Sequence, residues 1–146
     1  MSENKSAENN FSKIDSAENN FESILSAVKF GADGLVTAVA IDEKDGAVLM
    51  LAHMNAESLK LTLTNGVMTY WSRSRKKLWV KGETSGNIQK VVRAALDCDG
   101  DALLFTVRPE GAGAACHQGY RSCFFRTLQK GEWTIQGKPL IPPTDH

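Results

Sequence analysis

Apolar residues along the chain fall into short runs separated by polar turns, a pattern typical of a small domain built mainly from β-strands. The apolar runs at 35–41 and 47–52 flank the polar segment 42–46, DEKDG, whose Asp-Gly ending favours a β-hairpin. Further strands are predicted at 67–71, 78–81, 102–107 and 123–128. The segment 88–96 carries both strand and helix signals, and both alternatives stay open.

Two segments carry the signals of helices. Apolar residues three and four positions apart predict a short helix over 21–30. A second helix is predicted from Asn55, a suitable N-cap, to about residue 64, with Asn65-Gly66 as its end. The segment from Gly131 onward contains KPLIPP and is too rich in proline for a core strand. The sequence thus predicts an α+β fold, a mostly antiparallel or mixed β-sheet with one or two helices.

The first 20 residues differ in composition from the rest of the chain. SAENNF occurs at 6–11 and again at 16–21, and few other positions there are apolar. Such a segment buries too little apolar surface to offset its ordering entropy. Residues 1–20 are therefore predicted to be a mobile extension, with a short helix formed on dimer contact as the alternative. Residues 21–146 are predicted to be a single domain.

Charge and hydropathy argue against several classes of protein. The 17 Lys and Arg residues equal the 17 Asp and Glu residues, so a nucleic-acid or anionic-membrane binder is disfavoured. No apolar run approaches the roughly 18 residues of a membrane-spanning helix, and the polar N-terminus lacks the apolar region of a secretory signal. We therefore expect a cytoplasmic protein with no nucleic-acid or membrane partner. Three cysteines, an odd number, do not suit a disulfide scaffold.

The segment DCDGD at 97–101 is the first candidate site. In an extended segment its three aspartates point one way and Cys98 points the other. The carboxylates repel one another, and a divalent cation removes that cost. Oxygen ligands suit Mg²⁺ or Ca²⁺, whereas the thiolate suits Zn²⁺. The spacing excludes an EF-hand, and a solvated acidic turn between two strands is the alternative.

The segment CHQGYRSC at 116–123 is the second candidate site. With Cys98 it offers three thiolates, which leave the fourth position of a zinc ion for water or for His117. An open fourth position is typical of catalytic zinc, and His117 is then a candidate general acid or base. The alternatives are three buried, inert thiols and an ordinary loop histidine.

A basic stretch at 73–93 is the third candidate site. Seven basic side chains in it are opposed only by Glu83. The Arg, Ser and Gly residues of WSRSR and KGETSGN suit a phosphate group, and Trp71 and Trp79 offer surfaces on which a base can stack. A solvated charged surface and RNA binding are the alternatives, the second weakened by the zero net charge.

Three motifs follow one another along the chain: YWSRSRKKLWVKGETSGN, DCDGDALL and ACHQGYRSCFFR. In sequence and spacing they resemble the phosphoribosyl-AMP cyclohydrolases of histidine biosynthesis, over about 34–126. The resemblance implies hydrolytic opening of the adenine ring of 1-(5-phosphoribosyl)-AMP between N1 and C6, by a zinc-activated water, to give the imidazole carboxamide ProFAR. It also implies an obligate-looking homodimer with metal sites between the subunits, and Zn²⁺ and Mg²⁺ as cofactors.

The resemblance also implies roles for individual residues. Zinc is implied to lie between Cys98 of one subunit and Cys116 and Cys123 of the other. The implied magnesium ligands are Asp97, Asp99 and Asp101. His117 is implied to be catalytic. The residues implied to bind the phosphorylated nucleotide substrate are Trp71, Arg73, Ser74, Arg75, Lys81, Glu83, Thr84 and Ser85.

The chain departs from the usual family pattern at two positions. Gln118 stands where the family usually has Thr, and His53 stands where it often has Tyr. Only 20 residues follow Arg126, so we expect the cyclohydrolase step alone and no fused pyrophosphohydrolase. Two rival functions remain at this point, a non-catalytic zinc-stapled dimeric binding domain and a zinc nucleoside deaminase. The H-x-E…P-C-x-x-C signature of the deaminases is absent.

Overall fold

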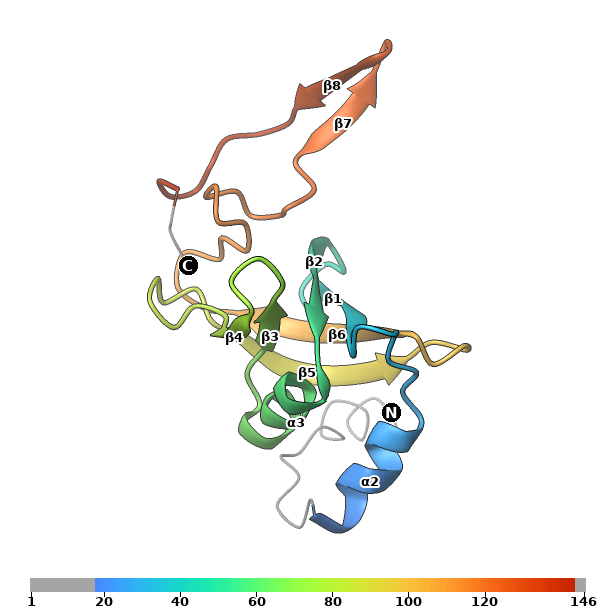
Figure 1. The fold of residues 1–146 in the computed structure, drawn as a ribbon. Helices are drawn as coiled ribbons and strands as arrows, with labels where there is room; N and C mark the ends of the chain where they lie inside the picture. The colour runs from blue at the N-terminus through green and yellow to red at the C-terminus, as the bar shows by residue number, and fades with distance from the viewer. Residues whose placement is uncertain (1–17, 144–146) are drawn as a thin grey trace, which may run out of the picture.

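The computed structural model describes residues 18–143 as a six-stranded sheet with two helices and a separate two-stranded ribbon (Figure 1). The helices are α2 (Glu18–Ser26) and α3 (Ala56–Asn65). The strands of the sheet are β1 (Val36–Asp42), β2 (Val48–Met54), β3 (Thr69–Ser72), β4 (Lys77–Val80), β5 (Gln89–Leu96) and β6 (Ala102–Pro109). The ribbon consists of β7 (Arg126–Gln129) and β8 (Glu132–Ile135).

The sheet is mixed, in the order β4-β3-β2-β1-β6-β5. The neighbours β1 and β6 are parallel, and every other neighbouring pair is antiparallel. The open alternative at 88–96 is resolved as strand β5, which pairs with β6 from Gln89 to Leu96. The predicted α+β class with a mixed sheet and two helices is therefore confirmed.

The two ends of the sheet meet because the sheet curls. The backbone N–H of Met68, just before β3, donates to the carbonyl oxygen of Gln89 on β5 at 2.9 Å. The N–H of Val91 donates to the carbonyl oxygen of Gly66 at 2.8 Å. These bonds join strands that are four places apart in the sheet order, so the curled sheet encloses its own core.

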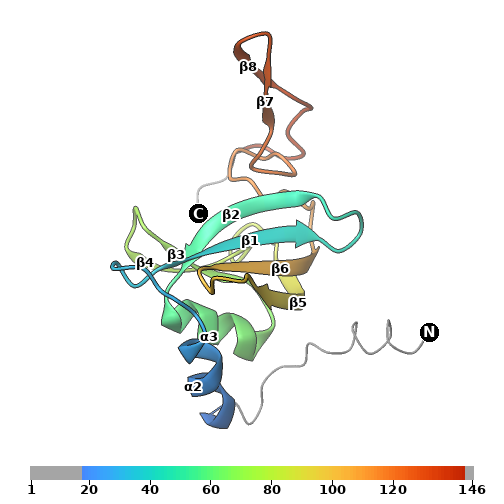
Figure 2. The same ribbon diagram turned by 90° about the vertical axis from the view of Figure 1, so that its right-hand side faces the viewer.

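The core lies inside this curl and under the helices. Along β1 the residues alternate between buried and half-buried, as expected for a strand with one face on the core. Leu103, Phe105 and Val107 provide the corresponding face of β6. Helices α2 and α3 lie on the same side of the sheet, where Phe21 and Leu59 join the buried cluster (Figure 2).

Helix α3 has the ends that its sequence predicts. The N–H of Ser58 donates to the side-chain oxygen of Asn55 at 2.8 Å, and the N–H of Asn55 donates to the hydroxyl of Ser58, which makes a capping box. Gly66 ends the helix in the left-handed conformation with φ of 76°. Among residues 18–143, no helix is long and apolar enough to cross a membrane.

Helix α2 differs from its prediction at both ends. It ends at Ser26, four residues short of the predicted 30, because the chain then turns and the N–H of Lys29 donates to the carbonyl oxygen of Gly100 at 2.7 Å. It begins at Glu18 and so includes the last three residues of the predicted extension 1–20. The other 17 residues of that extension lie outside the described part of the chain.

The C-terminal part forms an exposed ribbon. The strand predicted over 123–128 begins only at Arg126, and it pairs with β8 rather than with the core sheet. The segment from Gly131 was predicted not to form a core strand, and β8 indeed lies outside the core sheet. Figures 1 and 2 both show the ribbon projecting from the body of the protein. Its apolar side chains are exposed, with Trp133 at 70%.

A buried polar network ties the curled sheet together. Tyr70 on β3 is fully buried, and its hydroxyl donates to Oε1 of Gln89 on β5 at 2.9 Å. The amide nitrogen of Gln89 contacts Sδ of Met50 on β2 at 3.4 Å. One glutamine side chain therefore joins three strands, and burial of the phenol raises the pKa of Tyr70.

We predict that Tyr70→Phe lowers the free energy of unfolding by about 1–3 kcal/mol, because Oε1 of Gln89 then stays buried without its donor. Urea denaturation at fixed protein concentration measures the loss. The control is Tyr70→Phe combined with Gln89→Met, which removes both partners and should cost less than the two single losses added together. Strictly additive losses would contradict the role given to this hydrogen bond.

Candidate active site

A cavity of about 440 Å³ lies beside strands β3 and β4 and the loop that follows β4. Of the eight residues predicted to bind substrate, five line it: Arg75, Lys81, Glu83, Thr84 and Ser85. Its remaining lining residues are Ser72, Lys77, Leu78, Trp79, Val80 and Gly82. The cavity thus combines an aromatic ring with cations and hydroxyl groups, which is the chemistry that a phosphorylated nucleotide requires.

Three of the predicted substrate residues are not part of this lining. Trp71 lies half-buried on β3, opposite Leu78 of β4. Arg73 and Ser74 are exposed in the turn between β3 and β4. The lining instead includes Trp79, the other aromatic residue that the basic stretch offers for stacking on a base.

The loop after β4 is held in a tight turn by its own backbone. The N–H of Gly86 donates to the carbonyl oxygen of Gly82 at 2.8 Å, and the N–H of Asn87 donates to Oγ of Ser85 at 3.2 Å. The side-chain oxygen of Asn87 also accepts from the N–H of Ala112 at 2.9 Å. Because these bonds fix the turn, the exposed side chains of Thr84 and Ser85 stay at the edge of the cavity.

Lys81 connects the cavity to the cysteines. Its side chain is only 4% exposed, and its Nζ lies 5.8 Å from the centre of the Trp79 ring. Burial lowers the pKa of Lys81, whereas the charges of the Cys123 and Cys116 thiolates act to raise it. The lysine thus both lines the cavity and lies within the electrostatic reach of the cysteine pair.

Cys116 and Cys123 lie together because the loop between them folds back. The N–H of Gly119 donates to the carbonyl oxygen of Cys116 at 2.8 Å, and the N–H of Cys123 donates to the carbonyl oxygen of Leu49 at 2.7 Å. Burial, and then the neighbouring Cys116, raise the pKa of Cys123 to about 12. Two such thiols ionise together only beside a cation, which is what a thiolate-bound metal supplies.

The N–H of Gln118 donates to Sγ of Cys116 at 3.4 Å. This contact comes from the main chain and not from the glutamine amide. Gln118 in place of the usual Thr therefore leaves the contact to the sulfur intact.

Cys98 lies far from the other two cysteines within one chain. It is exposed in the turn between β5 and β6, whereas Cys116 follows the opposite end of β6. Strand β6 has eight residues, which at about 3.3 Å per residue span about 26 Å. Within one chain, Cys116 and Cys123 therefore lie at one end of β6, and Cys98 lies at the other end.

The three aspartates form a compact cluster around Cys98. Carboxylate oxygens of Asp97, Asp99 and Asp101 lie within 4.8 Å of one another, and all three residues are exposed. Although desolvation acts to raise the pKa of Asp97, hydrogen bonds from the N–H of Asp101 and from its other partners lower it. The pKa of Asp101 is raised, first by its hydrogen bond with Asp97 and then by that neighbour's charge. This crowding of negative charge fits a hard divalent cation such as Mg²⁺.

His117, the predicted catalytic residue, and His53, the residue at a position where the family often has Tyr, differ in their surroundings. His117 is exposed and directly follows the buried Cys116, at the mouth of the cysteine loop. His53 is half-buried on β2, opposite Trp71, and its pKa is lowered by burial and then by the charge of Arg73. Only His117 belongs to the cysteine loop.

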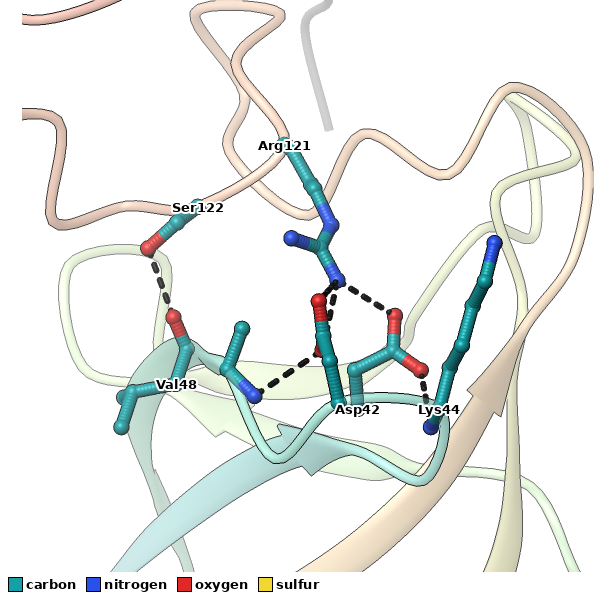
Figure 3. A network of polar contacts seen from close by, with 7 residues as sticks. Asp42, Lys44, Val48, Arg121 and Ser122 are labelled. Atoms are coloured by element: carbon teal, nitrogen blue, oxygen red, sulfur yellow. Dashed lines mark hydrogen bonds and ion pairs between the residues drawn. The ribbon is translucent and has the colours of Figure 1, made fainter.

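Sequence reasoning missed a network that ties the cysteine loop to the turn between β1 and β2 (Figure 3). The guanidinium of Arg121 contacts the carboxylates of Asp42 and Asp45, and the hydroxyl of Ser122 donates to the carbonyl oxygen of Val48 at 2.7 Å. The one sequence signal for it is an acid, Asp42, at the end of an otherwise apolar run.

We predict that Gly82→Ala is far more damaging than Gly86→Ala. Both glycines have φ near +83°, so both alanines incur about 1–2 kcal/mol of left-handed strain. A Cβ at Gly82 would also lie 2.4 Å from the backbone of Asn87, whereas a Cβ at Gly86 meets nothing within 4 Å. Gly82→Ala should therefore cost at least about 1 kcal/mol more than its control, and should raise KM for 1-(5-phosphoribosyl)-AMP.

Urea denaturation and steady-state kinetics on both variants make this comparison. Equal losses at the two glycines would show that the loop is not packed as described.

Comparison with known proteins agrees with the sequence motifs and the site. The family model described as phosphoribosyl-AMP cyclohydrolase matches residues 50–125. A phosphoribosyl-AMP cyclohydrolase of Nitrosomonas europaea is 53% identical over 117 residues, which are 80% of this chain and 89% of that protein. Those of Caulobacter vibrioides and Salinibacter ruber are 54% and 51% identical, over 78% and 82% of this chain and 82% and 93% of their own lengths. The chain therefore belongs to the phosphoribosyl-AMP cyclohydrolase family.

Proposed function

We propose that the chain works as a homodimer in which zinc is shared between Cys98 of one subunit and Cys116 and Cys123 of the other. The reaction is that of its family, the hydrolytic opening of the adenine ring of 1-(5-phosphoribosyl)-AMP between N1 and C6 in histidine biosynthesis. The observation that carries the proposal is the length of β6, which separates Cys98 from the other two cysteines within one chain.

The C-terminal ribbon supports the homodimer independently. Leu128, Trp133 and Ile135 expose more than half of their surface, and Phe124 just before the ribbon is 59% exposed. A two-stranded ribbon is marginally stable by itself, and exposed apolar side chains of this size are typical of an interface. A second copy of the chain is the partner whose docking also brings Cys98 to the cysteine pair.

The three cysteines of a completed site fit zinc. Three thiols are the soft ligands that zinc prefers, and they leave one position open. Zinc held there lowers the pKa of a bound water to about 7 and so supplies a nucleophile at neutral pH. The cysteines are free thiols, which fits the reducing cytoplasm that we propose as the location.

The cavity residues hold and orient the nucleotide. Arg75, Thr84 and Ser85 present the cation and hydroxyl groups that bind phosphoryl oxygens. Trp79 presents a ring on which the adenine can stack. Nζ of buried Lys81 lies 5.8 Å from the centre of this ring, and the lysine also interacts electrostatically with Cys123 and Cys116, so the stacking ring and the cysteine loop are neighbours.

We assign proton transfer to His117. In the reaction, water adds its oxygen to C6, the N1–C6 bond breaks, and N1 takes up a proton as C6 becomes a carboxamide. His117 follows a zinc-binding cysteine directly and is exposed to the open side of the loop. An imidazole exchanges protons near neutral pH and suits this transfer.

The aspartate cluster is the proposed magnesium site. Cys98 lies in the same turn as Asp97, Asp99 and Asp101. Zinc sharing therefore brings the acidic turn of one subunit to the cysteine loop of the other. Magnesium held there serves the substrate bound in the other subunit's cavity, where it neutralises phosphate charge.

We predict that two inactive variants recover activity when they form mixed dimers. Cys98→Ser and Cys116→Ser should each lose zinc and turnover as homodimers. Mixed after reversible unfolding, half of the dimers contain one of each variant, and one of their two sites then has all three cysteines. The mixture should recover about a quarter of wild-type activity.

The matched control mixes Cys116→Ser with Cys123→Ser, which lie in the same half-site and should not restore activity. Failure of the first mixture, in heterodimers verified by mass spectrometry, would sink the shared site.

We predict that His117→Ala keeps zinc and the dimer and loses turnover by about a hundredfold or more. Metal analysis and size-exclusion chromatography check the first two properties, and the ultraviolet change on ring opening checks the third. The control is His53→Tyr, which lies outside the cysteine loop and should retain activity. Normal turnover by His117→Ala would remove the histidine from the mechanism.

A further inference from the structure

Arg121 lies between Cys116 and Cys123 in the sequence, and its side chain points toward the hairpin of β1 and β2 (Figure 3). Its Nη2 lies 2.9 Å from Oδ2 of Asp42 and 2.9 and 3.0 Å from the two carboxylate oxygens of Asp45. Asp42 is the last residue of β1, and Asp45 lies in the turn that joins β1 to β2. One guanidinium thus fastens the cysteine loop to a β-hairpin of the core sheet.

The two acids are themselves fixed by the hairpin. Oδ1 of Asp42 accepts from the N–H of Lys44 at 2.8 Å, and Oδ1 of Asp45, which also contacts Arg121, accepts from the N–H of Ala47 at 3.1 Å. The N–H of Gly46 closes the turn on the carbonyl oxygen of Asp42 at 2.7 Å. The carboxylates therefore form a rigid receptor, and they keep Arg121 protonated by raising its pKa, Asp45 first and Asp42 second.

Two neutral hydrogen bonds also join the loop to the sheet. Ser122 donates to Val48, and the N–H of Cys123 donates to Leu49. Cys123 also packs against the hydrophobic core. Arg121 adds a charged contact to these, and hydrogen bonds between charged groups are about twice as strong as neutral ones. Loss of the guanidinium would therefore remove the charged contact between the loop and the hairpin and leave the neutral ones.

We propose that Arg121 is a positioning residue that holds Cys116 and Cys123 as a preformed pair of zinc ligands. The inference rests on the zinc site proposed above. Ligands that are fixed before the metal arrives bind it more tightly, because the binding step no longer has to order them. Arg121 does not hold substrate phosphate, because its guanidinium already binds two carboxylates and it does not line the nucleotide cavity.

The test compares zinc affinities of the purified homodimers by competition with a chromogenic chelator. Arg121→Met and Asp45→Asn should each weaken zinc binding, the first by about 10- to 100-fold. Arg121→Lys should fall between Arg121→Met and the wild type, because one ammonium cannot contact two carboxylates as a planar guanidinium does. The double variant Arg121→Met/Asp45→Asn should bind zinc no more weakly than Arg121→Met, because both changes remove one contact.

A second readout separates positioning from general destabilisation. Cobalt replaces zinc, and its visible absorption reports the geometry of the thiolate ligands. Arg121→Met should alter this spectrum, and saturating zinc should restore activity with KM for the nucleotide unchanged. The matched control is Arg108→Met, since Arg108 also pairs with an acid of the same hairpin, Glu43, but lies on β6 outside the cysteine loop.

The outcomes distinguish a failure of the positioning role of Arg121 from a failure of the proposed zinc site. Wild-type zinc affinity and an unchanged cobalt spectrum in Arg121→Met would overturn the positioning role. Equal weakening of zinc binding by Arg108→Met would also overturn it, because the effect would then not belong to the loop. If Cys116→Ser binds zinc as tightly as the wild type, the proposed zinc site itself is wrong. Asp45→Asn and Arg121→Lys decide the question if Arg121→Met does not fold.

Discussion

The parallel pairing of β1 with β6 is the constraint on which the rest of the site depends. It sets β6 inside the sheet between β1 and β5, with the acidic turn at its beginning and the cysteine loop beyond its end. An eight-residue strand does not bend back on itself, so the acidic turn and the cysteine loop are held at opposite ends of β6. The proposed shared zinc site follows from this separation, because symmetric pairing of two copies would complete two such sites at once.

The same sheet also connects the cavity with the cysteines. Strand β4 leads from the basic turn to Lys81. The N–H of Cys123 donates a hydrogen bond to the carbonyl oxygen of Leu49, the second residue of β2. Lys81 is buried at the meeting point of these two segments. A buried ammonium group such as that of Lys81 is stabilised only by neighbours that carry negative charge or have an electron-rich face. Here these neighbours are the thiols and the ring of Trp79. The cavity and the cysteine pair are therefore connected through the side chain of Lys81.

Local signals in the sequence predicted local structure well. The cap at Asn55 and the end at Gly66 depend on hydrogen bonds within a few residues, and both were predicted correctly. The end of α2 depends on a bond between Lys29 and Gly100, which no local pattern contains. The segment 88–96 was ambiguous for the same reason, because pairing with β6 decides its conformation.

The candidate site shows the same contrast between features that depend on nearby residues and features that depend on distant ones. Motifs in the sequence located the aspartates, the cysteines and five cavity residues, since each motif is short. The sequence did not show that Trp71, Arg73 and Ser74 lie outside the cavity lining, because their neighbours Ser72 and Arg75 do line it and the motif does not reveal which way each side chain points. Nor did it show Arg121 with Asp42, since these residues are 79 positions apart and meet only in the folded chain.

That separation has a consequence for the order of assembly during synthesis. A ribosome must release nearly the whole chain before Arg121 meets the hairpin that was made 79 residues earlier. Contacts between distant parts of a chain form late in folding, because closing a long loop costs entropy before the contact repays it. The nascent chain thus exposes its cysteines as separate thiols until the sheet has closed. The pair formed by Cys116 and Cys123 therefore exists only in chains that have already folded.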